Sequence, residues 1–149
     1  MGADLYISQL FDPQFQKWHK RFDKAIAERD GLPEDSPKRG EAQKRAEHSF
    51  DKMYEQGYFR DSYNDSSVLW KFGLSWWKDV IPMLNDDSQL TPEKASALLS
   101  MLKEREGEFE CNLASEQEPV RRYFRRKYKA LQGFLNQAIQ LGVPIVCSL

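Results

Sequence analysis

The run SSVLWKFGLSWWKDVIP, residues 66–82, is the stretch from which we predict the fold. When this run is wound as an α-helix, apolar residues occur on nearly every side, which is typical of a helix at the centre of a domain. Trp70, Leu74 and Trp77 follow i, i+4, i+7 spacing, so we expect them to share one buried face. Pro82 should kink or end this helix.

Apolar residues recur at helical spacing in four further segments, two on each side of the central run. These predicted helices begin at Asp12, near Ser36, at Thr91 and near Glu116. Residues 4–10 alternate loosely and could form a short strand or an N-terminal arm. The apolar tail 143–149 is β-prone and could pack on the core or pair with residues 4–9 in a small ribbon. The sequence therefore predicts a mainly α fold, a compact bundle of about five helices around the Trp-rich one, with a possible small β-ribbon.

Length and composition indicate one globular domain. The chain has 149 residues, so we expect residues 1–149 to form a single helical domain. Hydrophobic residues make up 40% and charged residues 30%, the balance of a soluble protein rather than a disordered one. The net charge of −1 argues against capture of nucleic acid or an anionic membrane by the chain as a whole, but it leaves room for a local patch.

The sequence contains no familiar catalytic, cofactor or metal motif. Cys111 and Cys147 lie in no CxxC pattern or Cys/His cluster, so no metal site is predicted. Gly-rich phosphate loops and nucleophile elbows are absent as well, so we predict no catalytic residue and no cofactor. The N-terminus lacks a signal peptide, and no apolar run approaches the ~20 residues of a membrane span, so we expect a cytoplasmic protein.

A polar and aromatic segment just before the central run is the first candidate for a binding site. Hydroxyl, carboxylate, amide and guanidinium groups concentrate there, beside the expected N-terminus of a helix, which favours anions. Tyrosine rings suit planar ligands. The residues that we assign to this candidate ligand site are Tyr58, Arg60, Asp61, Tyr63, Asn64 and Asp65.

The same residue types also suit a turn that only supports the fold. In that interpretation Asp65 or Ser66 caps the helix, Arg60 pairs with an acid, and the tyrosines pack. The leading functional hypothesis is a non-catalytic binding protein, such as a regulator, an inhibitor or a ligand sponge. It would take a small polar or nucleotide-like ligand, or a protein partner. An enzyme with an unfamiliar site in the same segment is the first alternative.

A basic and aromatic run in the last predicted helix gives the second alternative, nucleic-acid binding. Six cations occur among residues 121–129 and could contact phosphates, and we assign to this candidate site Arg121, Arg122, Arg125, Arg126 and Lys129. Six glutamates occur between residues 104 and 118, and a helical hairpin would bring them close to these cations. Ion pairing within the chain, or simple solvation, is therefore the competing interpretation.

Three stretches resemble a family of small proteins from bacteria and their phages. They are MGADLYI at residues 1–7, GYFRDSYND at residues 57–65 and LWKFGLSWW at residues 69–77. The resemblance covers most of the chain. It implies a bacterial or phage origin, and it implies no particular activity, fold or ligand.

Overall fold

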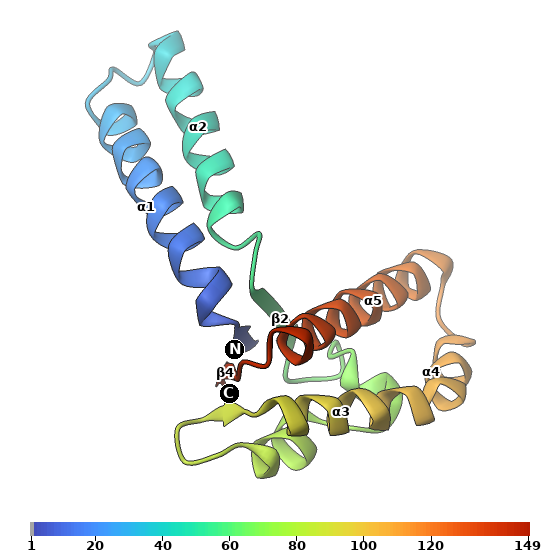
Figure 1. Cartoon of the computed structure of the whole chain (residues 1–149). Helices are drawn as coiled ribbons and strands as arrows, with labels where there is room; N and C mark the ends of the chain where they lie inside the picture. The colour runs from blue at the N-terminus through green and yellow to red at the C-terminus, as the bar shows by residue number, and fades with distance from the viewer. Residues whose placement is uncertain (1) are drawn as a thin grey trace. The chain divides into compact units, whose positions relative to one another are not determined.

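The computed structural model describes residues 2–149, which fall into two compact units. The hairpin unit is Ser8–Tyr58, and the sheet unit combines the described part of Met1–Ile7 with Phe59–Leu149. Figure 1 shows the course of the chain through both units.

The hairpin unit consists of two long helices, α1 (Ser8–Asp30) and α2 (Pro37–Met53). Figure 1 shows them running side by side in opposite directions, and small side chains dominate their contact. The buried residues are Phe11, Ala25, Ala42, Ala46, Ser49 and Met53. The predicted start at Asp12 is wrong, because Phe11 extends the apolar stripe by one turn and Pro13 lies inside the helix.

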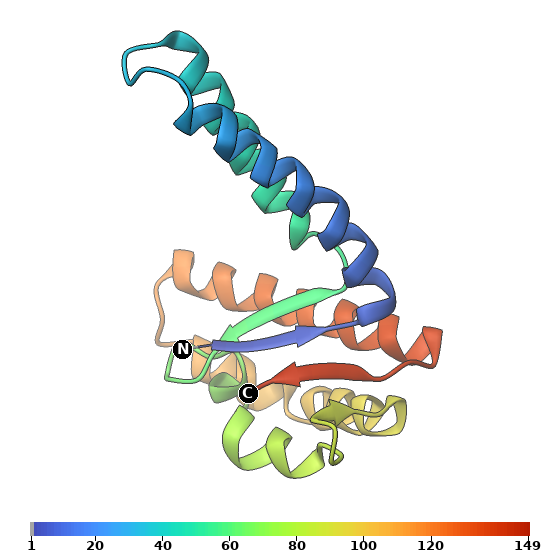
Figure 2. The same cartoon turned by 90° about the vertical axis from the view of Figure 1, so that its left-hand side faces the viewer.

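The sheet unit is built on a four-stranded antiparallel sheet in the order β2-β1-β4-β3. The strands are β1 (Gly2–Tyr6), β2 (Tyr58–Ser62), β3 (Gln89–Leu90) and β4 (Ile145–Ser148). Leu5 lies opposite Cys147 in the β1–β4 pair, so the predicted ribbon from the terminal segments is confirmed. Figure 2 shows β2, β1 and β4 side by side.

Three α-helices accompany this sheet: α3 (Pro92–Glu104), α4 (Glu106–Leu113) and α5 (Glu118–Leu141). The α5 helix lies behind the strands in Figure 2, and its apolar stripe is buried. The ring of Phe134 on α5 lies 6.1 Å, centroid to centroid, from that of Phe59 on β2. The mainly α fold with a small β element is therefore confirmed. The helix predicted to begin at Thr91 corresponds to α3, and Arg105 separates it from α4.

The central run is not one α-helix, which corrects the prediction for residues 66–82. It forms three short helical turns, Leu69–Phe72 (η1), Trp76–Val80 (η2) and Ile81–Met83 (η3). Gly73 adopts a left-handed conformation with φ of 72° and ends the first turn, and Ser75 is extended. Because the helical register is lost at Gly73, Trp70 and Trp77 do not share a buried face with Leu74.

Trp76, not Trp77, is the buried tryptophan of this run, since their exposed fractions are 1% and 70%. We expect Trp76→Ala to lower the free energy of unfolding by about 3–5 kcal/mol, because it leaves a cavity in the core. Trp77→Ala should lower it by less than about 1 kcal/mol, as a surface substitution does. Urea denaturation of both variants measures the difference. Equal losses would show that the run packs in another register.

Candidate functional site

Asp61 is the structural centre of the predicted ligand segment. Along β2, Phe59 and Asp61 point into the core, and the Asp61 side chain is 4% exposed. Its carboxylate accepts hydrogen bonds from the Ser67 hydroxyl at 2.7 Å, the Trp76 indole N–H at 2.7 Å and the Val68 backbone N–H at 3.1 Å. These bonds fix the course of the chain after β2, so Asp61 supports the fold.

Two other members of the predicted segment have local structural roles. The Asn64 side-chain oxygen accepts a hydrogen bond from the Ser66 N–H at 2.9 Å, and its carbonyl accepts one from the Ser67 N–H at 2.8 Å. Asn64 therefore shapes the turn that follows β2. Tyr58 packs in the hairpin unit, where its ring lies 4.9 Å from that of Tyr54. Asp65 is exposed.

Tyr63 carries a buried hydroxyl that has no hydrogen-bond partner within residues 2–149. Burial raises the pKa of this phenol, and the nearby Asp4 and Cys147 raise it further. The hydroxyl therefore stays protonated and is not prepared to act as a nucleophile.

Arg60 points to the opposite side of β2 from Asp61 and lines a small recess of about 210 Å³. Ser62 shares this recess, and Tyr123 and Lys127 of α5 line it from the other side. The Arg60 Nε lies 3.7 Å from an Asp4 carboxylate oxygen. The recess thus brings a member of the predicted ligand segment beside the basic run of α5, two features that are far apart in the sequence.

Gly2 permits the close approach of Arg60 to the end of β1. A Cβ atom at this position would lie 2.9 Å from the Arg60 Nε and 3.0 Å from the Asp61 carbonyl oxygen. Any larger residue would therefore push the guanidinium aside. Lys127 is placed by a different contact, because its ammonium lies 5.2 Å from the centroid of the Phe59 ring.

The sequence places Tyr123 and Lys127 in the basic and aromatic run, but it does not connect them with the ligand segment. Helical spacing indicated only that the basic run has an exposed side, which would face solvent. Spacing within one helix does not show which strand packs beside it, so the position of α5 beside β2 could not be predicted. The one available signal was the density of cations between residues 121 and 129.

Several cations of the basic run pair with neighbouring glutamates. Arg125 lies 2.8 Å from Glu110, and Arg121 lies 2.8 Å from Glu118. Arg122 is 3.9 Å from the same Glu118. Hydrogen bonding to Arg125 lowers the pKa of Glu110, and the pairing with Arg121 lowers that of Glu118. Arg126 and Lys129 are exposed.

Comparison with known proteins adds no relative. The sequence matches no protein-family model, and no curated protein and no solved structure matches it significantly. In the part of the chain that the structure describes, none of the helices has the length and apolar character needed to cross a bilayer.

The buried carboxylate gives the first prediction for this segment. Asp61→Ala leaves three buried donors unpaired, and each costs about 1–3 kcal/mol, so the free energy of unfolding should fall by roughly 3 kcal/mol or more. Asp65→Ala is the matched control and should change it by less than about 0.5 kcal/mol. Chemical denaturation at neutral pH makes the comparison. A loss below about 1 kcal/mol in Asp61→Ala would contradict the role assigned to this carboxylate.

The pair between Glu110 and Arg125 gives a prediction for pH dependence. Because the pKa of Glu110 is lowered in the folded state, the pair stabilises the protein fully above the ordinary glutamate pKa. This contribution disappears as the pH falls through the lowered value. We expect Arg125→Gln to return the pKa of Glu110 toward its ordinary value, as measured by NMR titration of the carboxyl carbon. An unchanged titration would show that the pair does not persist in solution.

Proposed function

We propose that this chain is a non-catalytic binding protein that holds an anionic group of a small polar or nucleotide-like ligand in the recess between β2 and α5. The single observation that carries the proposal is the meeting of Arg60 and Lys127 in one recess. Carboxylate and phosphate groups are the natural partners of two neighbouring cations, and a guanidinium can bind them with two parallel hydrogen bonds.

The surroundings of the two cations support an anion over a cation as the ligand. Asp61 lines the recess, but its carboxylate oxygens are engaged by Ser67, Val68 and Trp76 in the core. The hydroxyls of Ser62 and Tyr123 can each donate a hydrogen bond to an oxygen of the ligand.

The size of the recess limits what it can hold. A space of about 210 Å³ suits one phosphate or carboxylate group, and the rest of a nucleotide-like ligand would extend into solvent. A protein partner could present the same anionic group from a side chain. A regulator, an inhibitor or a ligand sponge in the cytoplasm of a bacterium or a phage-infected cell fits such a site.

Titration of the isotope-labelled protein with inorganic phosphate and with AMP, followed by two-dimensional NMR, tests the proposal. We expect saturable shifts of the amide signals of β2 and of α5 around Tyr123 and Lys127. Arg60→Gln and Lys127→Gln each remove a charged hydrogen bond worth about 1.5–3 kcal/mol, so each should weaken binding roughly tenfold or more.

Lys129→Gln is the matched control, because Lys129 lies on the same helix, is exposed and does not line the recess. It should bind both probes like the parent. The proposal fails if neither probe gives saturable shifts at this recess, or if the Arg60 and Lys127 variants bind as the parent does. Conversion of AMP to a product during the titration would favour the alternative function, an enzyme with an unfamiliar site in the same segment.

A further inference from the structure

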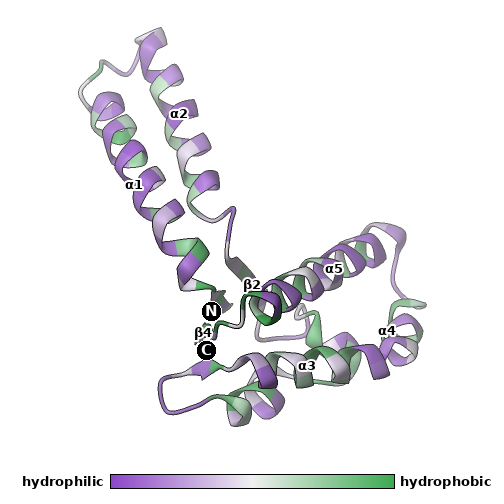
Figure 3. Cartoon of the chain, viewed as in Figure 1, coloured by the Kyte–Doolittle hydropathy of each residue, from purple (hydrophilic) through white to green (hydrophobic). Residues whose placement is uncertain are grey.

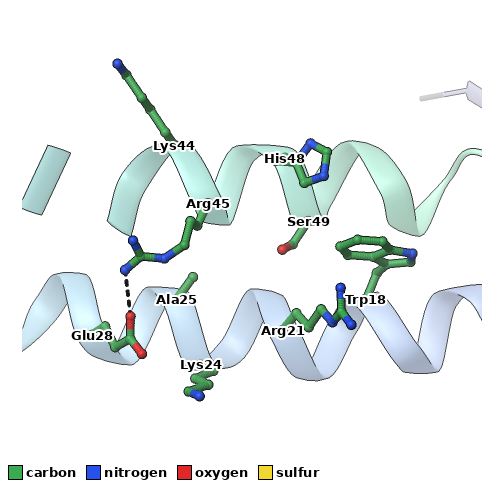
Figure 4. Close-up of a pocket in the computed structure, with 9 residues that line it drawn as sticks. All are labelled: Trp18, Arg21, Lys24, Ala25, Glu28, Lys44, Arg45, His48 and Ser49. Carbon is green, nitrogen blue, oxygen red and sulfur yellow. Dashed lines mark hydrogen bonds and ion pairs between the residues drawn. The ribbon is translucent and has the colours of Figure 1, made fainter. Parts of the chain in front are cut away.

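A second basic site lies in the hairpin unit, in a part of the chain that the sequence did not single out. One side of the pair α1 and α2 is hollowed into a groove of about 480 Å³. Ala25 of α1 and Ser49 of α2, both buried, line it, and each points toward the other helix (Figure 4). Such small side chains leave the space between the two helices unfilled.

Cations line this groove from both helices. Arg21 and Lys24 belong to α1, and Lys44 and Arg45 belong to α2. Figure 4 shows Lys24 and Lys44 extending outward from the two rims, while Arg45 reaches across to α1. There Arg45 pairs with Glu28 at 2.7 Å, and Glu28 is the one acidic residue that lines the groove within residues 2–149. The groove therefore carries a net positive charge.

Two acidic residues of the hairpin lie on a different surface from the groove. Glu47 and Asp51 line a separate hollow there, together with Phe22 and Phe50. Arg29 lines this second hollow as well, so it has no excess of cations, whereas the groove does. Figure 3 shows that hydrophilic residues dominate both helices, so hydropathy alone does not reveal this difference.

Flat side chains close one end of the groove. The Arg21 guanidinium lies 4.5 Å from the centroid of the Trp18 ring, and the His48 ring meets the same indole edge-on at 5.5 Å. Figure 4 shows Trp18, Arg21 and His48 gathered at this end. Indole and guanidinium planes are the surfaces on which unpaired nucleic-acid bases stack.

The groove also continues toward the loop end of the hairpin. A further hollow of about 330 Å³ shares Glu28 and Arg45 with it and adds Lys38, Glu41 and Leu32, so its acidic and basic residues balance. From Trp18 to Glu28 the α1 helix rises by about 15 Å, which matches a few nucleotides of a single strand. A base can stack on the Trp18 end only if it is unpaired, so the groove suits single-stranded rather than duplex nucleic acid.

We propose that the groove between α1 and α2 binds single-stranded nucleic acid. The cations of both rims contact the phosphates, and a base stacks at the Trp18 end. The net charge of −1 does not oppose this, because the potential that a strand meets depends on the local cations of the groove. The proposal is independent of the β2–α5 recess, since it uses only residues of the hairpin unit.

Fluorescence anisotropy of the full-length protein with labelled oligo-dT and oligo-rU, about 20 nucleotides long to cover the site, tests the groove. We expect binding that weakens as the salt concentration rises. The double variant Lys24→Gln/Lys44→Gln should reduce the affinity tenfold or more, and the slope of log K against log salt should fall by about 2. The double variant Lys94→Gln/Lys103→Gln removes the same charge from exposed positions of α3 in the sheet unit and should bind like the parent.

A second pair of variants separates nucleic acid from other polyanions. Trp18→Leu should weaken oligonucleotide binding severalfold, and Trp18→Phe should retain it, with melting followed by circular dichroism to verify that both are folded. Inorganic polyphosphate and poly-glutamate serve as competitors. If either competes as strongly as the oligonucleotide and Trp18→Leu changes nothing, the groove is a general polyanion or acidic-peptide site and the proposal is overturned. Equal loss of affinity in both charge variants would overturn it too.

Discussion

The carboxylate of Asp61 is the constraint on which the sheet unit depends. A buried carboxylate is costly unless its oxygens are hydrogen-bonded, and here the donors come from Ser67, Val68 and Trp76. To bring those donors to one carboxylate, the chain must turn sharply after β2 and then turn Trp76 inward. The same alternation along β2 that directs Asp61 into the core directs Arg60 outward to the recess. Asp61, which supports the fold, and Arg60, which lines the candidate site, thus lie on opposite faces of one strand.

Much of the fold could be predicted from the sequence where one pattern acts over many residues. The long apolar stripe of α5 and the β-prone termini gave elements that the structure confirms. The run from 66 to 82 could not be predicted this way, because a single residue, Gly73, resets the helical phase between two tryptophans. The strand β2 was missed as well, since a buried aspartate breaks the alternation of apolar and polar residues that marks a strand.

The candidate sites show a similar limit. Arg60 and the cations of α5 were each noticed, but their meeting depends on packing between segments more than 60 residues apart. In the hairpin, Lys44 and Arg45 look in sequence like the solvated face of an ordinary helix. Only the small residues between α1 and α2, which leave the groove unfilled, give those cations a shared concave surface. Spacing rules describe one helix at a time, whereas a groove is a property of two.

The place of the hairpin in the chain has a consequence of its own. It is inserted between β1 and β2, which are adjacent antiparallel strands of one sheet. Such neighbours can be joined by a turn of only two residues, so the sheet needs none of the length that separates them here. Selection can therefore lengthen, shorten or exchange this module without altering the strand pairing. Proteins of the same architecture could carry the sheet unit with a different insertion, and with it a different surface for recognition.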